Sequence, residues 1–501
     1  MIVQPAKLGT LYLLVSAPIL MLLASPAAAQ HSMDNMPGMG AQSHTHTPMP
    51  NEPGTKEGPA EPATPSSTMN HGSEEQSAPK ESPPTSMPVE PPADHETMDG
   101  GSMDHSMMTM DGQGGHQPMT GAFGSYPMQR DSSGTAWQPD TSGHSGVTVP
   151  SGDWMLMGHA LLNLVYDHQS DNRGDDKMFV SGMAMGMARR LLGNGTLQLR
   201  AMLSPDPAMG RRGYPLLLAS GETANGVDRL VDRQHPHDLF MELSASVSQN
   251  IGARSSLFLY GGLPGEPAFG PPAFMHREAI LDSPEAPISH HWLDSTHISF
   301  GVVTAGLVFD RAKLEVSRFN GREPDENRWN IETGPLDSTS VRISWNPSRT
   351  LALQASWGHF EEPEELEPGV DQKRWSASAL YTEEISPGWR LAATFAWGRK
   401  TIGDHKDDAV ASEVSVRHGA WTIFGRGEIA ENRELVEVDH GRAFQVGKVS
   451  LGAIHDFSVA EHMSLGVGGL FALNFVPGVL ATLYGSDTPI GTMGFVRVKI
   501  D

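Results

Sequence analysis

The residues with the clearest capacity for chemistry are histidines and carboxylates that bracket the stretch 232–297. Imidazole nitrogens and carboxylate oxygens together form a ligand set for Cu(II), Zn(II) or Ni(II). Pro236 keeps its two flanking histidines extended, so both imidazoles can point to one side. The stretch therefore predicts a candidate metal site with these ligands: His235, His237, Asp238, His276, His290, His291, Asp294 and His297.

The same residues have a structural alternative. Buried His–Asp pairs can fold two long loops into a plug at the mouth of a barrel, and Arg233 and Arg277 can join such a network. The histidine spacing matches no closed zinc signature. In either arrangement a carboxylate can hold the second nitrogen of a histidine. The sequence leaves plug and metal site as open alternatives.

A second set of possible ligands lies in the low-complexity residues 30–150. This segment is rich in Pro, Gly, Ser, Thr, Met, His and acidic residues, with few large aliphatic side chains. It cannot bury enough apolar surface to offset its ordering entropy, so we expect it to be disordered. Thioether sulfur favours Cu(I), and imidazole accepts either oxidation state of copper. The alternative is a bare spacer. The expected copper ligands are His95, Met98, Met103, His105, Met107, Met108, Met110 and His116.

The elements that must position the first set begin near Trp154, where the sequence changes to short alternating segments. In residues 374–381, Trp375, Ala377, Ala379 and Tyr381 share one face of a strand and Arg374, Ser376 and Ser378 the other. Period-two alternation with aromatic residues near the strand ends is typical of a transmembrane β-barrel.

We therefore predict an all-β, antiparallel outer-membrane barrel over residues 151–501, with about 16 strands in a range of about 12 to 16. The expected strands cover 154–167, 177–189, 196–204, 239–249, 254–262, 297–308, 312–320, 338–345, 350–358, 374–383, 389–398, 409–418, 420–429, 445–456, 463–473 and 492–500. Short turns and longer loops are expected to alternate strictly, with the short turns on the periplasmic side.

This arrangement brings the candidate site together. Loops 205–238 and 263–296 lie on the same, long-loop side, because a hairpin over residues 239–262 returns the chain to the side it left. The histidines of both loops should therefore meet, with His297 opening the next strand. The disordered tail is expected on the opposite, periplasmic side of the membrane.

Residues 1–29 have the features of an export signal: an apolar run after Lys7 and a small-residue cleavage site at Ala27–Ala29. An uncleaved anchor is the alternative. The chain has no cysteine, so no disulfide stabilises it. Its net charge of -24 argues against nucleic acid as a partner.

Two resemblances add to this interpretation. The leader, through Met103-Asp-His-Ser-Met107, is similar to that of the outer-membrane copper-resistance protein B family. The body resembles a family of uncharacterised Gram-negative outer-membrane barrels through Trp154–His159, Asp232–Phe240, Gly270–His276 and Ser289–His297. The first resemblance implies copper handling and covers the leader only. The second implies the barrel fold and covers residues 151–501.

Together these features predict an outer-membrane barrel for copper tolerance, binding or transport, with a tail that sequesters copper in the periplasm. Copper would be a bound ion that the fold does not require. Expected partners are outer-membrane lipid, lipopolysaccharide and periplasmic copper proteins. One alternative is a small-solute porin. Another is an outer-membrane hydrolase using Ser289 or Ser295, although no Gly-x-Ser-x-Gly or His-Glu-x-x-His motif is present and we expect no enzyme.

Overall fold

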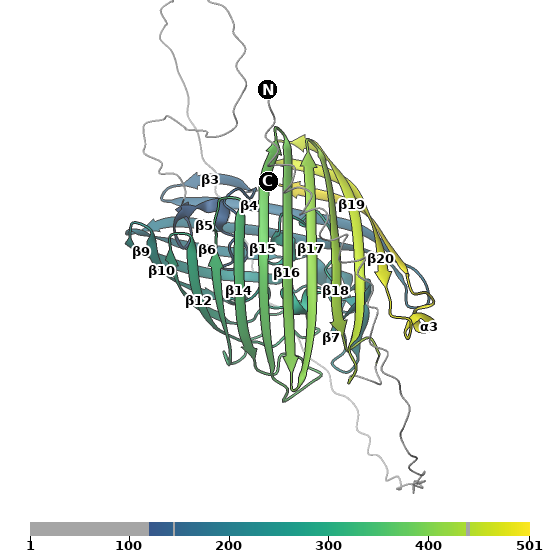
Figure 1. The fold of residues 1–501 in the computed structure, drawn as a ribbon. Helices are drawn as coiled ribbons and strands as arrows, with labels where there is room; N and C mark the ends of the chain where they lie inside the picture. The colour runs from purple at the N-terminus through teal and green to yellow at the C-terminus, as the bar shows by residue number, and fades with distance from the viewer. Residues whose placement is uncertain (1–119, 144–145, 437–440) are drawn as a thin grey trace, which may run out of the picture. The chain divides into compact units, whose positions relative to one another are not determined.

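Alternating strands from residue 154 onward close into an antiparallel barrel of sixteen strands, as predicted (Figure 1). The computed structural model describes residues 120–143, 146–436 and 441–501. The expected signal peptide and the tail ligands lie outside these described residues. None of the helices in the described part of the chain has the length and hydropathy of a membrane-spanning helix.

The barrel strands are β4 (Trp154–Gln169), β5 (Asp176–Leu192), β6 (Gly195–Leu203), β9 (Phe240–Gly252), β10 (Ser255–Gly262), β11 (Val302–Phe309), β12 (Ala312–Phe319), β13 (Ser338–Trp345), β14 (Leu351–Phe360), β15 (Gln372–Ser386), β16 (Trp389–Ile402), β17 (His405–His418), β18 (Trp421–Asn432), β19 (Phe444–Ala460), β20 (Met463–Phe475) and β21 (Ile490–Ile500). The barrel closes where β21 pairs with β4, and β3 (Val147–Ser151) extends the same edge of β4.

Shorter elements are not strands of the barrel wall. They are β1 (Thr120–Gly121), β2 (Gly124–Pro127), η1 (Met128–Arg130), η2 (Asp206–Met209), β7 (Tyr214–Thr223), β8 (Arg229–Gln234), η3 (Phe274–His276), α2 (His290–Leu293) and α3 (Ala481–Tyr484). The sequence did not predict any of them as a separate element.

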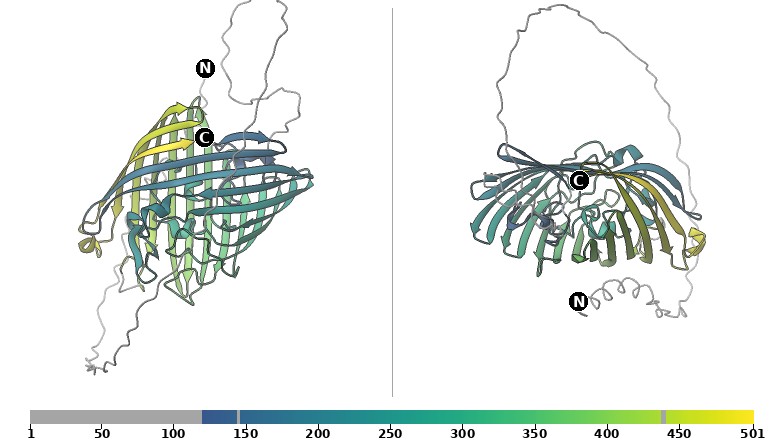
Figure 2. Two further views of the ribbon diagram at one scale, coloured as in Figure 1. Left: turned by 180° about the vertical axis from the view of Figure 1, so that it is seen from behind. Right: turned by 90° about the horizontal axis from the view of Figure 1, so that it is seen from above.

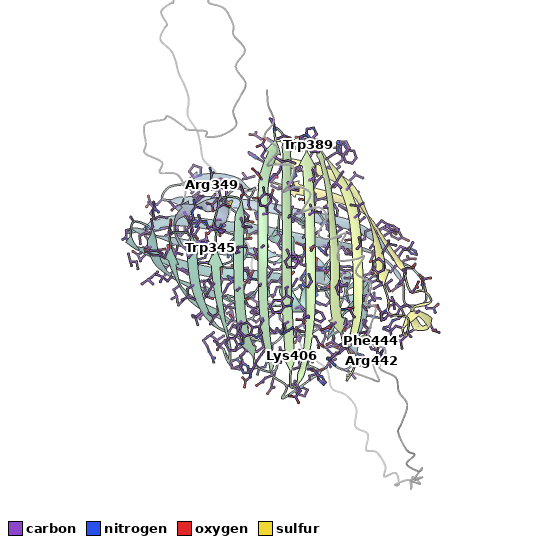
Figure 3. All side chains as sticks on the ribbon, in the orientation of Figure 1. Trp345, Arg349, Trp389, Lys406, Arg442 and Phe444 are labelled. Atoms are coloured by element: carbon purple, nitrogen blue, oxygen red, sulfur yellow. The ribbon has the colours of Figure 1, made fainter. Side chains whose placement is uncertain are left out.

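The wall has a polar inner face and an apolar outer face. Arg374 is 1% exposed inside the barrel, whereas its neighbour Trp375 is 49% exposed outside. The aromatic residues Trp345 and Trp389 project from the outer surface near one end (Figure 3). Other exposed apolar side chains on the strands include Leu257, Leu259, Leu307, Leu314, Val316, Ile343, Ile423, Leu451, Val467, Phe471, Val496 and Val498. This apolar outer surface with a polar lumen is that of an outer-membrane barrel.

The two ends of the barrel differ in their connections. We call the end with the tight turns after β5, β9, β11, β15 and β17 the turn end, and the opposite end the loop end. One predicted long loop is wrong. Strand β16 continues to Ile402 and β17 begins at His405, so the two strands are joined by a tight turn at 403–404. Alternation of the polar residues persists there, so the ladder extends beyond the apolar part of the wall.

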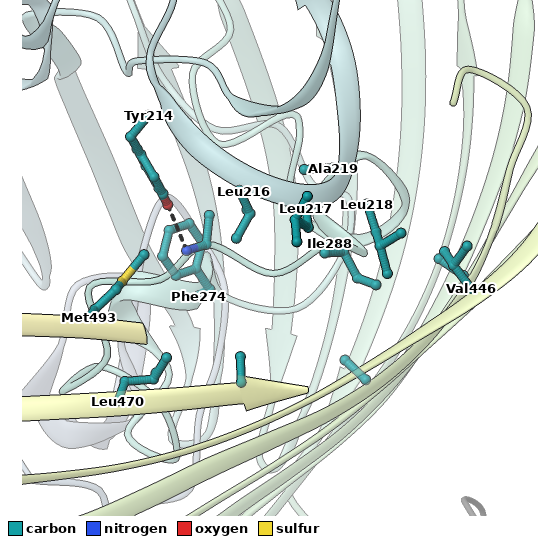
Figure 4. Packing of buried hydrophobic residues seen from close by; sticks show 14 of the residues in the cluster. Tyr214, Leu216, Leu217, Leu218, Ala219, Phe274, Ile288, Val446, Leu470 and Met493 are labelled. Atoms are coloured by element: carbon teal, nitrogen blue, oxygen red, sulfur yellow. Dashed lines mark hydrogen bonds between the residues drawn. The ribbon is translucent and has the colours of Figure 1, made fainter. Parts of the chain in front are cut away.

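Two long loops fold inward from the loop end and fill much of the lumen (Figure 2, right). The β7–β8 hairpin supplies Leu216, Leu217 and Leu218, which are 0% exposed. Figure 4 shows these side chains and Ile288 of the second loop in one apolar cluster with wall residues such as Val446 and Leu470. The apolar cluster fixes both loops against the barrel, because removing such side chains from water is favourable by about 1.5–3 kcal/mol each.

A third segment, residues 120–143, fills the lumen at the turn end. Its aromatic side chains Phe123, Tyr126 and Trp137 pack against Phe258 of the wall. Residues 120–143, which the sequence predicted to be part of a disordered segment, are therefore folded, because their aromatic side chains supply apolar surface that can be buried against the wall.

Candidate metal centre

Five of the predicted histidines meet inside the barrel. His235 and His237 follow β8, His290 and His291 lie on α2, and His297 follows α2. Neighbouring ring centroids are 4.9 Å apart for His237 and His297, 5.1 Å for His290 and His297, and 5.5 Å for His235 and His290. All five are less than 9% exposed. The convergence of two loops on one side is as predicted, although His297 lies before β11 rather than within it.

Three of these histidines form a set suited to a metal ion. His237, His290 and His297 each offer a ring nitrogen, and the three nitrogens lie within 4.8 Å of one another. The Nε2 atoms of all three are buried and have no hydrogen-bond partner in the described structure. The three residues are called the three-histidine cluster below.

Two residues of the three-histidine cluster have a fixed tautomer. His237 Nδ1 lies 2.8 Å from a carboxylate oxygen of Asp206, and His297 Nδ1 lies 2.5 Å from the carbonyl oxygen of Asp294. Both oxygens only accept, so both Nδ1 atoms donate and both Nε2 atoms keep their lone pair. A carboxylate or carbonyl on the second nitrogen is the usual support of a metal-binding histidine.

The third member, His290, is held by α2 and not by a hydrogen bond of its own. Its Nδ1 lies 3.8 Å from Asp294, and neither ring nitrogen has a partner. Asp294 is bonded to Arg277, which also makes two bonds of 2.7 Å to Glu413 of β17. Trp292 of the same helix donates its indole N–H to Asp407 O at 3.1 Å. The ring position of His290 is thus set by the contacts of the helix with the wall.

The remaining two histidines flank the cluster. His291 Nδ1 lies 3.1 Å from Glu323, and His235 Nδ1 lies 3.3 Å from Glu222. Glu222 also pairs with Arg328. These carboxylates hold both histidines beside the three-histidine cluster. The Nε2 atom of His235 is also buried without a hydrogen-bond partner.

Burial favours the neutral imidazole at three of the histidines, whereas at His291 burial is outweighed by Glu323, which raises the pKa of that histidine. Burial lowers the pKa of His290 to about 4, and burial together with the neighbouring charges holds the pKa values of His235 and His297 well below their usual range. For Asp294, burial opposes ionisation, but Arg277 overcomes it and the pKa falls to about 2. Neutral imidazole is the form that binds a metal ion.

Two other predicted site residues, Asp238 and His276, lie apart from the cluster. Asp238 pairs with Arg328 at 3.2 Å. His276 lies on η3 and lines a separate cavity. Asp294 supports the cluster through its carbonyl oxygen and Arg277. The eight predicted copper ligands between His95 and His116 lie outside the described residues.

The sequence did not identify Asp206, Glu222 and Glu323 as carboxylate partners of the histidines. Asp206 and Glu222 occupy the loop that also carries His237, so proximity along the chain was the available signal. Glu323 comes from the separate β12–β13 connection, and no local pattern indicates it.

The serines of the hydrolase alternative are bonded elsewhere. The Ser289 hydroxyl donates to Glu428 at 2.7 Å, and Ser295 accepts from Arg374 at 2.5 Å. A serine nucleophile needs a general base such as histidine at its hydroxyl. A second group of possible ligands is mostly half-exposed, and exposed acidic groups are common without an ion; its members are His359, Glu361 and Asp371.

No protein-family model matches the chain, and no curated protein matches it in sequence. Among solved structures, it is similar to OmpF of Salmonella typhi in complex with daunomycin, at 10% identity over 71% of this chain and 100% of that chain, with a TM-score of 0.46. It is also similar to a loop-deletion mutant of Vibrio cholerae OmpT (8% identity, 70% and 99% covered, TM-score 0.42) and an anion-selective porin from Comamonas acidovorans (11%, 69% and 100%, 0.40). Similarity at this level concerns the barrel fold alone.

Proposed function

We propose that this protein binds copper inside an outer-membrane barrel and serves copper binding, tolerance or transport. The observation that carries the proposal is the three-histidine cluster, in which three ring nitrogens lie within 4.8 Å of one another and the buried Nε2 atoms have no hydrogen-bond partner in the described structure. The expected export signal and the Met/His-rich tail belong to the same proposal, with the tail holding Cu(I) in the periplasm.

The unpartnered nitrogens favour a metal site over a plug. In a plug, histidines would satisfy one another or nearby carboxylates, since buried polar groups are normally hydrogen-bonded. Each buried nitrogen left without a partner costs about 1–3 kcal/mol. The apolar cluster around Leu216 and Ile288 already holds the loops in the lumen, so the histidines are not needed for that purpose.

Copper is the preferred ion for two reasons. Imidazole sites bind Cu(II) more strongly than Ni(II) or Zn(II) when geometry permits. The cluster also belongs to a chain whose leader is rich in thioether and imidazole groups.

A small-solute channel is the second candidate, because barrels of about 16 strands are wide enough to leave an aqueous lumen. The inward-folded loops and residues 120–143 oppose a wide lumen here. The channel would have to run past these segments.

The test is metal titration of the purified full-length protein with Cu(II) and Zn(II). We expect the double variant His237→Gln/His290→Gln to lose one equivalent of bound divalent ion. His168→Gln is the matched control, because that histidine is exposed and bonded to Asp176. Equal stoichiometry and affinity in all three proteins would contradict the proposal.

A further inference from the structure

A second set of metal-binding side chains surrounds a cavity of about 120 Å³ beside the three-histidine cluster. Met183, Met185 and Met187 alternate along β5, so their side chains share the inner face of the wall. Met275 and His276 approach from η3. Four thioethers and an imidazole therefore face one space.

Neighbouring strands extend this set. His159 of β4 lies opposite Met185, and Met185 lies opposite Met202 of β6. Met202 and Met241 are buried in the same apolar cluster, against which Met185 also packs. The concentration of thioethers continues across three strands of the wall.

Methionine often serves only as flexible core filling. Two observations separate this cavity from a filled core. Met185, Met187 and Met275 are only partly buried and leave the space between them open. In addition, His276 Nε2 is buried without a hydrogen-bond partner.

The charges around the cavity do not favour an anion. Arg189 is paired with Asp131 at 3.1 Å, and Arg200 with Glu242 at 2.8 Å. Lys499 pairs with the carboxylate of Asp501. These cations are neutralised by their partners, so the lining is governed by thioether and imidazole groups. Such ligands select soft monovalent ions such as Cu(I).

The cavity adjoins the three-histidine cluster through shared elements. Phe274, which begins η3, has its ring 6.2 Å from His237 and 5.8 Å from His290. The carboxylate of Asp206 that supports His237 also accepts from the N–H of Gly182, next to Met183. The cavity and the cluster thus lie on two sides of the same loop.

At its other side the cavity is bounded by the N-terminal segment, through Asp131, Ser132 and Gln138. It therefore lies between that segment and the three-histidine cluster.

We propose that this cavity is a second metal site, in which Met183, Met185, Met275 and His276 hold a soft monovalent ion such as Cu(I). It deepens the proposed copper function and rests on it. The three-histidine cluster, which lacks sulfur, would take the harder divalent ion, so the barrel interior holds two sites of different ligand chemistry.

The experiment uses Ag(I), a soft monovalent ion that does not change oxidation state, with the full-length protein. Bound silver is counted after dialysis against a competing thioether ligand. We expect the triple variant Met183→Leu/Met185→Leu/Met275→Leu to bind one equivalent less Ag(I) than the wild type. Met178→Leu is the matched control, since Met178 lies on the same strand but is 66% exposed on the outer face. Silver bound by the tail is common to all three proteins and cancels.

Two readouts separate the possible failures. Bound Zn(II) reports the three-histidine cluster and is expected to be equal in the wild type and the triple variant. A wild type that binds no divalent ion contradicts the proposed function, whereas an unchanged Ag(I) count in the triple variant overturns the second site. If the triple variant does not fold, His276→Gln takes its place, with at least a tenfold loss of Ag(I) affinity expected and no loss overturning the inference.

Discussion

Three imidazole nitrogens without a protein partner are the reason for proposing a metal site rather than a plug in the barrel interior. The Nδ1 atoms of His237 and His297 are hydrogen-bonded to Asp206 and to a carbonyl oxygen, so their Nε2 atoms keep a free lone pair. One ring nitrogen from each of these two residues and from His290 lies within 4.8 Å of the other two. A hydrogen-bonded plug has no use for such an arrangement. A metal ion does, because it requires several lone pairs at one point.

Asp206 should therefore tune metal affinity without contacting the ion. Asp206→Asn keeps the size of the side chain but removes the negative charge that fixes the His237 tautomer. We expect divalent-metal affinity to fall by about 10–100-fold. Asp228→Asn, an exposed change in the same loop, should leave it unaltered. Metal titration of the two variants measures this, and equal affinities would exclude a supporting role for Asp206.

The stability of the folded protein should depend on pH through Glu266, in the loop between β10 and β11. Burial raises its pKa to about 7, and the attraction of Arg342 only partly offsets this. The folded protein then holds a proton that the unfolded chain has lost above about pH 4.5. Stability should fall as pH rises from 4.5 through 7, by up to about 3 kcal/mol from this group.

Denaturant unfolding in detergent at pH 5 and pH 8, followed by tryptophan fluorescence, tests this. Glu266→Gln should lose most of the difference between the two pH values, because its side chain cannot ionise. Glu461→Gln is the control, since that side chain is 91% exposed. An unchanged difference in Glu266→Gln would show that other groups cause it.

At the scale of elements, the short helix α2 positions His290 and His291 through its contact with the wall. Gly398 of β16 allows this contact, because a Cβ there would lie 2.5 Å from the carbonyl oxygen of Trp292. The helix backbone cannot yield as a flexible side chain would.

Gly398→Ala should therefore displace α2 and weaken metal binding about tenfold while the barrel remains folded. Gly494→Ala on β21 is the matched control, because a Cβ there meets no other atom within 4 Å. Metal titration together with the heat-dependent gel mobility of the barrel measures both effects. Normal affinity in Gly398→Ala would mean that the helix position does not govern the site.

The strands were largely predictable, and the lumen was less so. Each wall strand faces membrane lipid on one side and polar groups on the other, so apolar and polar side chains alternate strictly along it. This alternation identified the strand that contains Trp375. The folded loops follow no such period. Their arrangement depends on long-range contacts such as that of Arg277 with Glu413, between residues 136 positions apart. The meeting of the histidines was predictable from the hairpin, but their supporting carboxylates and the order of residues 120–143 were not.

At the scale of the whole molecule, segments that enter from both ends pack the barrel. We expect the wild type to show much smaller single-channel conductance in planar bilayers than an open porin of about 16 strands. Replacing residues 267–296 with a short Gly-Ser linker should raise the conductance several-fold, because this loop fills the lumen. A wild type that already conducts as an open porin would favour the channel alternative.

The central claim is that the barrel holds a metal ion on three histidines. Anomalous X-ray scattering from crystals of the protein loaded with Cu(II) or Zn(II) tests it most directly. We predict a peak about 2.0–2.1 Å from the Nε2 atoms of His237, His290 and His297. Loaded crystals without a peak at these nitrogens, or with metal only on surface residues, would contradict it.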